Sequence, residues 1–112
     1  MELLTTASEQ GVCIASPTVK RLDASVALAF KEAMLKQAVS DGGTVLDLSN
    51  VQFMDSSGLG ALVSVLKATA NRGGLAVCNV NNAVLSLFKL TRMDKVFSIS
   101  ASREEAVRKA GG

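Results

Sequence analysis

Two adjacent serines at the start of a predicted helix are the residues of this chain best suited to accept a chemical group. Asp55, Ser56 and Ser57 follow a strand-like stretch and precede a run of apolar residues at helical spacing. Unpaired backbone N–H groups and the positive end of the helix dipole meet at such a position, so a phosphate is tolerated there. These residues predict the presentation of a serine hydroxyl rather than catalysis.

Helix capping alone is the alternative interpretation of the same residues. Asp55, Ser56 and Ser57 are all good N-cap residues, and a helix needs only one. Gly58 and Gly60 favour a functional interpretation, because a glycine costs about 1 kcal/mol relative to alanine inside a helix. The close approach of another backbone, or of a partner protein, would explain glycine at these positions.

Several catalytic chemistries are excluded. The chain has no histidine, which rules out Ser-His-Asp and Cys-His catalysis and histidine-ligated zinc or iron. The segment Gly58-Leu59-Gly60 lacks the third glycine of a dinucleotide-binding loop, and no P-loop motif occurs. Asp47 or Asp55 could be the phosphorylated aspartate of a receiver domain, but the acidic pair that would hold magnesium is missing. We expect no enzyme, no cofactor and no metal site.

Composition indicates one domain with a genuine core, because 48% of the 112 residues are hydrophobic. The net charge of +2 is scattered, and there is no Trp or Tyr to stack on bases, so we expect no nucleic-acid partner. Cys13 and Cys78 lie in apolar runs and are expected to be buried thiols. Because neither a signal peptide nor a bilayer-spanning apolar run is present, we expect a cytoplasmic protein without a membrane partner.

Strands alternate with helices along the chain, which predicts βα units, a mostly parallel sheet and an α/β sandwich. An N-terminal hairpin that turns at 8–11 makes the predicted sheet mixed. The predicted strands are 3–6, 11–16, 18–22, 44–49, 75–80 and 96–99. The first predicted helix begins at an Asp23 or Ser25 cap and ends near Val39, and the second begins after the 55–60 turn and ends near Asn71. The third begins at an Asn81 or Asn82 cap and ends at Leu90, and the fourth begins at a Ser102 capping box and ends before Gly111.

The segments 46–51 and 53–60 closely resemble the signature of STAS-domain anti-sigma factor antagonists. The resemblance continues through 72–74 and 81–97 and includes Leu22-Asp23, so it spans essentially the whole chain. It implies a single STAS domain at 1–112, with an α/β fold, a mixed, mostly parallel β-sheet and about four helices.

In this family the first serine of Asp-Ser-Ser-Gly is the phosphoacceptor, which corresponds to Ser56. The resemblance implies that an anti-sigma factor with a histidine-kinase-like ATPase fold phosphorylates this serine and that a PP2C-type phosphatase reverses the reaction. The unphosphorylated chain would bind this kinase and release a sigma factor. The implied partner-binding residues are Asp23, Asp55, Ser57, Gly58, Leu59, Gly60, Ala61 and Ser64. Ala61, Ser64 and Ala68 offer a small-residue face to the partner, or are ordinary solvent-facing positions.

The chain departs from the family pattern at two places. Lys20-Arg21 stands where the family often has a glycine before the Leu-Asp pair, and Arg92 stands where glycine is usual. Neither departure touches the acceptor segment. Two alternatives stay open: a constitutive STAS scaffold of a transport or stress-sensing assembly whose serine is not modified, and a partner switch with another output, such as control of secretion.

Overall fold

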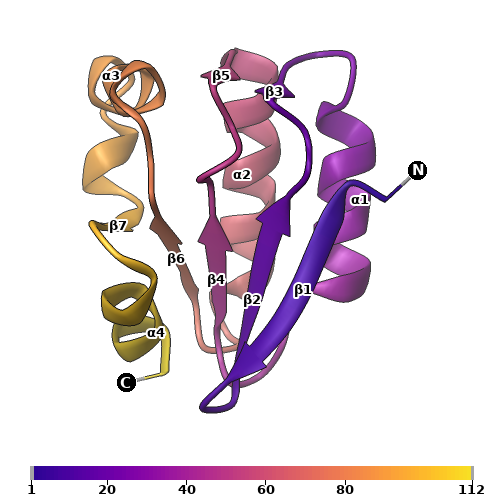
Figure 1. Ribbon diagram of the computed structural model, residues 1–112, viewed down its shortest axis with the longest axis vertical. Coiled ribbons are helices and arrows are strands. Elements are labelled where there is room, and N and C mark those ends of the chain that lie inside the picture. The colour runs from indigo at the N-terminus through magenta and orange to yellow at the C-terminus, as the bar shows by residue number, and fades with distance from the viewer. Residues whose placement is uncertain (1, 112) are drawn as a thin grey trace.

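A five-stranded sheet organises the chain in the computed structural model, which describes residues 2–111 (Figure 1). Its strands are β1 (Leu4–Glu9), β2 (Val12–Pro17), β4 (Thr44–Asp47), β6 (Leu75–Cys78) and β7 (Ser98–Ser100). They lie in the order β1-β2-β4-β6-β7; β1 is antiparallel to β2, and the other neighbours are parallel. The predicted mixed, mostly parallel sheet is therefore confirmed.

The hairpin between β1 and β2 closes at Gln10 and Gly11, whose φ angles are 53° and 80°. Two consecutive positive φ angles produce a tight turn that matches the right-handed twist of the strands. β4 and β6 are buried along their whole length, as expected for parallel strands covered on both faces.

Helices cover both faces of this sheet. They are α1 (Ala27–Gln37), α2 (Ser56–Thr69), α3 (Asn82–Leu90) and α4 (Arg103–Gly111), with a short 3₁₀ helix η1 (Met93–Lys95) after α3. Phe30, Leu62 and Phe88, from the first three helices, share one core cluster. Ala106 and Val107 of α4 belong to a second cluster, which packs against side chains of β2, β4 and β6. α4 therefore lies on the face of the sheet opposite to the other three helices. Figure 1 shows α2 behind the strands and α4 at the lower left, near the C-terminus.

A second, two-stranded parallel sheet lies at the end of the molecule where α2 begins (Figure 1). It consists of β3 (Arg21–Leu22) and β5 (Phe53–Met54), and Leu22 and Met54 are buried. The sequence predicted a strand that includes β3 but did not predict β5, because two residues carry no hydrophobic period. This small sheet positions the acceptor segment.

Several predicted boundaries were wrong by a few residues. β4 ends at Asp47, β6 at Cys78, α1 at Gln37 and α2 at Thr69, each before its predicted end, whereas β1 extends beyond Thr6 to Glu9. β6 ends early because Asn79 adopts a left-handed φ of 58°, which leaves the extended conformation. The last strand begins at Ser98 rather than Val96, because Val96 and Phe97 donate their N–H groups to Met93 O in the turn of η1.

Two predicted caps are present. Asn81 Oδ1 accepts a hydrogen bond from Val84 N at 2.8 Å, and Ser102 Oγ accepts one from Glu105 N at 3.2 Å. Among residues 2–111, no helix has the length and apolar character needed to cross a bilayer. The same residues contain no group of three or more Cys, Asp or Glu side chains arranged to hold a metal ion.

Candidate functional site

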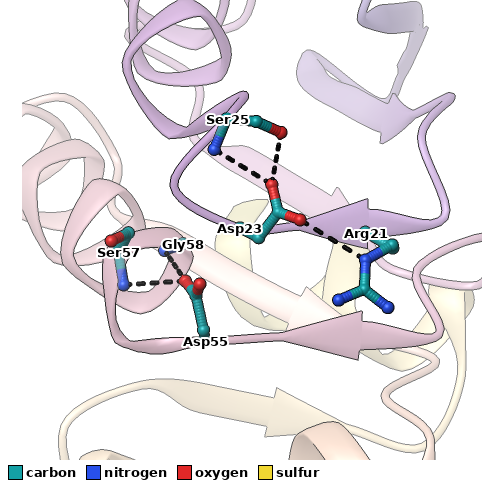
Figure 2. A network of polar contacts seen from close by, with 6 residues as sticks. All are labelled: Arg21, Asp23, Ser25, Asp55, Ser57 and Gly58. Atoms are coloured by element: carbon teal, nitrogen blue, oxygen red, sulfur yellow. Dashed lines mark hydrogen bonds and ion pairs between the residues drawn. The ribbon is translucent and has the colours of Figure 1, made fainter.

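Asp55 caps α2 and leaves the following serines exposed. Its Oδ1 accepts hydrogen bonds from Ser57 N at 2.9 Å and from Gly58 N at 3.1 Å (Figure 2). Ser56 is the first residue of the helix, and both serine side chains are exposed to solvent. Capping therefore explains Asp55, but it does not explain the two hydroxyl groups that follow.

Backbone pairing between β3 and β5 holds this turn in place. Arg21 lies opposite Phe53 and Leu22 opposite Met54, and Asp55 N donates to Leu22 O at 3.3 Å. Because side chains alternate along a strand and Leu22 and Met54 point into the core, Arg21 and Phe53 point outward. Asp23 and Asp55 follow the two parallel strands at the same edge, as Figure 2 shows.

The structure gives different explanations for the presence of glycine at positions 58 and 60. A Cβ on Gly58 would lie 2.1 Å from Leu22 O and 3.0 Å from Leu22 Cβ. The predicted close approach of another backbone is thus confirmed at Gly58, where α2 packs directly on β3. A Cβ on Gly60 would have no neighbour within 4 Å, and Gly60 is exposed. Only Gly60 leaves an open place on the outer face of the helix.

Three of the predicted partner-binding residues face the core instead of solvent. Leu59 is 6% exposed and Ala61 is 7% exposed, both within the main core cluster, and Gly58 is buried against Leu22. They are inward because α2 has β3 and the sheet on one side and α1 on another. The predicted small-residue face consequently loses Ala61. Ser64 is partly buried and donates its hydroxyl to Gly60 O at 3.2 Å, and Ala68 is exposed.

Asp23 stabilises the turn before α1 rather than the helix itself. Its Oδ1 accepts hydrogen bonds from Ser25 N at 3.0 Å and from Ser25 Oγ at 2.6 Å. The prediction that Asp23 or Ser25 caps α1 was wrong, since the helix begins at Ala27 and its N-cap, Val26, makes no side-chain hydrogen bond. The Ser25 hydroxyl, together with the Ser25 backbone and Arg21, holds the pKa of Asp23 below its usual value.

Sequence reasoning missed the pairing of Arg21 with Phe53. The guanidinium carbon lies 4.1 Å from the centre of the Phe53 ring, and Arg21 Nε lies 3.3 Å from Asp23 Oδ2. The sequence did contain a signal, because the segments 21–25 and 53–57 share a pattern. In each, an apolar residue at the second position is followed by Asp-x-Ser. This repeat marks two similar turns that lie side by side.

The remaining polar and thiol candidates have structural roles. Asp47 is buried, and its Oδ1 accepts hydrogen bonds from Ser49 N and Asn79 Nδ2, both at 3.0 Å. It thereby joins the loops that follow β4 and β6. Burial, with a smaller contribution from the Asp47 charge, raises the pKa of the Cys78 thiol to about 12. Cys78 is buried as predicted, whereas Cys13 is only partly buried.

Fold and site together define an α/β domain that presents an exposed serine at a helix N-terminus. The STAS domain family model matches residues 5–106. The chain belongs to the STAS-domain family of anti-sigma factor antagonists. Such antagonists are regulatory proteins and not enzymes.

Individual relatives agree with this family. The chain is 30% identical to an anti-sigma-B factor antagonist of Bacillus subtilis over 88 residues, which cover 78% of this chain and 81% of the relative. It is 45% identical to an anti-sigma F factor antagonist of Paenibacillus polymyxa over 56 residues, which span 49% of this chain and 48% of that relative. The crystal structure of an anti-sigma factor antagonist from Mycobacterium paratuberculosis superposes with a TM-score of 0.85 at 25% identity, covering 97% of this chain and 93% of that one.

Proposed function

We propose that this chain, as a single cytoplasmic STAS domain at 1–112, is an anti-sigma factor antagonist controlled by phosphorylation of Ser56. Its partner is an anti-sigma factor that is a serine kinase with a histidine-kinase-like ATPase fold. Binding of the unphosphorylated chain to this kinase releases the sigma factor, and phosphorylation ends the binding. A PP2C-type phosphatase restores the unphosphorylated state.

The observation that carries the proposal is that Asp55 caps α2 while Ser56 stays exposed to solvent. Asp55 satisfies the first free N–H groups of α2, so the Ser56 side chain stays exposed for a kinase. A phosphate at this position adds about −1.5 to −2 charges at the positive end of the helix dipole. We therefore expect the fold to tolerate the modification.

The docking surface, in contrast, changes strongly on phosphorylation. A partner that covers the exposed residues Ser56, Ser57 and Gly60 would have to desolvate a dianion next to the carboxylate of Asp55. A penalty of about 3 kcal/mol weakens binding roughly a hundredfold, which is enough for a switch. The surface proposed for the partner therefore consists of these residues with Asp23, Asp55 and the partly buried Ser64.

Phosphopeptide mass spectrometry on the chain from its own growing and stressed cells tests the proposal. We expect phosphate on Ser56 with an occupancy that changes between conditions. Ser57→Ala is the matched control, because it removes the neighbouring hydroxyl and leaves the acceptor in place. A Ser56 that stays unmodified in all conditions, including incubation with native lysate and ATP, would refute the switch and favour a constitutive scaffold.

A further inference from the structure

The surface beside the acceptor segment carries a cation that is held from two sides. Arg21 lies over the Phe53 ring, with its guanidinium carbon 4.1 Å from the ring centre. Its Nε pairs with Asp23 Oδ2 at 3.3 Å (Figure 2). Both contacts come from neighbouring residues in or beside the β3–β5 pair, which is itself fixed by backbone hydrogen bonds to Lys20 O and Leu22 O. The guanidinium is therefore preorganised on the surface.

Preorganisation matters here because both side chains remain accessible. The Arg21 side chain is 62% exposed, and Phe53 is 39% exposed even though it is a large apolar residue. Arginine and aromatic residues supply many of the strongest contacts in protein interfaces. An arginine already stacked and paired loses less conformational entropy on binding than a free one.

Asp23, by comparison, has little capacity left for a partner. Ser25 N and Ser25 Oγ donate to its Oδ1, and Arg21 occupies its Oδ2. Arg21 uses only its Nε in this ion pair, and the terminal nitrogens of a guanidinium are further donors suited to a carboxylate. Beside Phe53, at the start of the acceptor segment, the surface thus displays a cation, and the Asp23 carboxylate serves to orient it.

We propose that Arg21 is a specificity-determining contact of the partner surface and that the kinase meets it with a carboxylate side chain. Phe53 and Asp23 are positioning residues that hold the guanidinium. The inference rests on the proposed function, because Arg21 lies opposite Phe53 in the β3–β5 pair and β5 leads directly into Asp55 and Ser56, on the surface proposed for the kinase.

Titration calorimetry with the kinase that phosphorylates Ser56, purified with bound ADP, tests the inference. Arg21→Ala should weaken binding by about tenfold or more. Arg21→Glu should weaken it further, because it places a negative charge against the partner's carboxylate. Arg21→Lys should restore only part of the affinity, since lysine keeps the charge but loses the planar stack. Phe53→Ala should weaken binding less, and combined with Arg21→Ala it should have a smaller effect than the sum.

Arg72→Ala is the matched control. Arg72 is also an exposed arginine that pairs through Nε with an aspartate, Asp41, at 2.8 Å, but it follows the far end of α2. We expect the Arg72→Ala variant to bind the kinase with the same affinity as the unaltered chain. Thermal melting should show that all variants are folded.

The outcomes separate the two proposals. Suppose that the unaltered chain binds the kinase, that the Ser56→Asp variant does not, and that the Arg21→Ala variant binds as tightly as the unaltered chain. In that case this inference fails while the proposed function stands. If Arg21→Glu binds as well as Arg21→Ala, the partner has no carboxylate at this position and the inference fails in that part. If the unaltered chain does not bind a Ser56 kinase at all, both proposals fall.

Discussion

Replacing Gly58 or Gly60 by alanine should have opposite effects on stability, although the two glycines lie two positions apart in one helix. Alanine is favoured over glycine in a helix interior by about 1 kcal/mol. At Gly60 a Cβ meets nothing within 4 Å, so Gly60→Ala should retain this gain. We expect the free energy of unfolding to rise by about 0.5–1 kcal/mol.

At Gly58 the same methyl group meets backbone atoms. It would lie 2.1 Å from Leu22 O and 2.9 Å from Leu22 C, distances that real Cβ contacts do not reach. Relief requires that α2 moves away from β3 by about 1 Å, which would strain the hydrogen bond from Asp55 N to Leu22 O. Overpacking of this kind typically costs about 1–3 kcal/mol, so Gly58→Ala should lower the free energy of unfolding despite the propensity gain.

Urea unfolding at equilibrium, followed by circular dichroism, measures both variants against the unaltered chain. If the free energy of unfolding falls with urea concentration at the same slope in all three proteins, the unfolded state is unchanged. The urea midpoints of the two variants should then move in opposite directions. Two alanine variants that are equally stabilised would refute the close packing of α2 on β3. Two that are equally destabilised would refute the open position of Gly60.

Other perturbations have equally defined outcomes. Asp55→Ala should lower the free energy of unfolding by about 1–2 kcal/mol through loss of the α2 cap, whereas Asp55→Asn should keep most of it; urea unfolding measures both. Titration followed by NMR should place the pKa of Asp23 below the usual 3.8, and Ser25→Ala should raise it, because the hydroxyl hydrogen bond is removed. The raised pKa of Cys78, about 12 against the usual 9.0, favours the protonated folded state. The associated stability is complete below pH 9 and is lost as pH rises toward 12, so unfolding curves at alkaline pH should depend less on pH in Cys78→Ala.

Local interactions explain which parts of the fold could be predicted. The Asn81 and Ser102 caps each act within three residues. Residue type and spacing predicted the Ser102 cap and limited the other to Asn81 or Asn82. The order of strands and helices follows from hydrophobic periodicity, which is also a local property. Boundaries shifted where a distant contact or an unusual backbone angle intervened, as at Asn79.

The pairing of β3 with β5 was not predicted, and it decides the shape of the site. Each strand has two residues, and its hydrogen bonds connect segments separated by the whole of α1 and β4. Only when they pair does Arg21 lie over Phe53, and only then does Leu22 O occupy the space that a side chain at position 58 would need. Neither contact has a signature within one segment.

The sequence by itself determined that this chain is an α/β domain without histidine chemistry and that a serine stands at the start of a helix. These properties depend on residue types and on interactions within one or two turns of the chain. The tertiary structure alone decided which residues of the acceptor segment face outward: Ser56, Ser57 and Gly60 are exposed, whereas Leu59 and Ala61 are in the core. Burial depends on what packs against a helix from elsewhere in the chain, and here β3 and α1 supply those contacts.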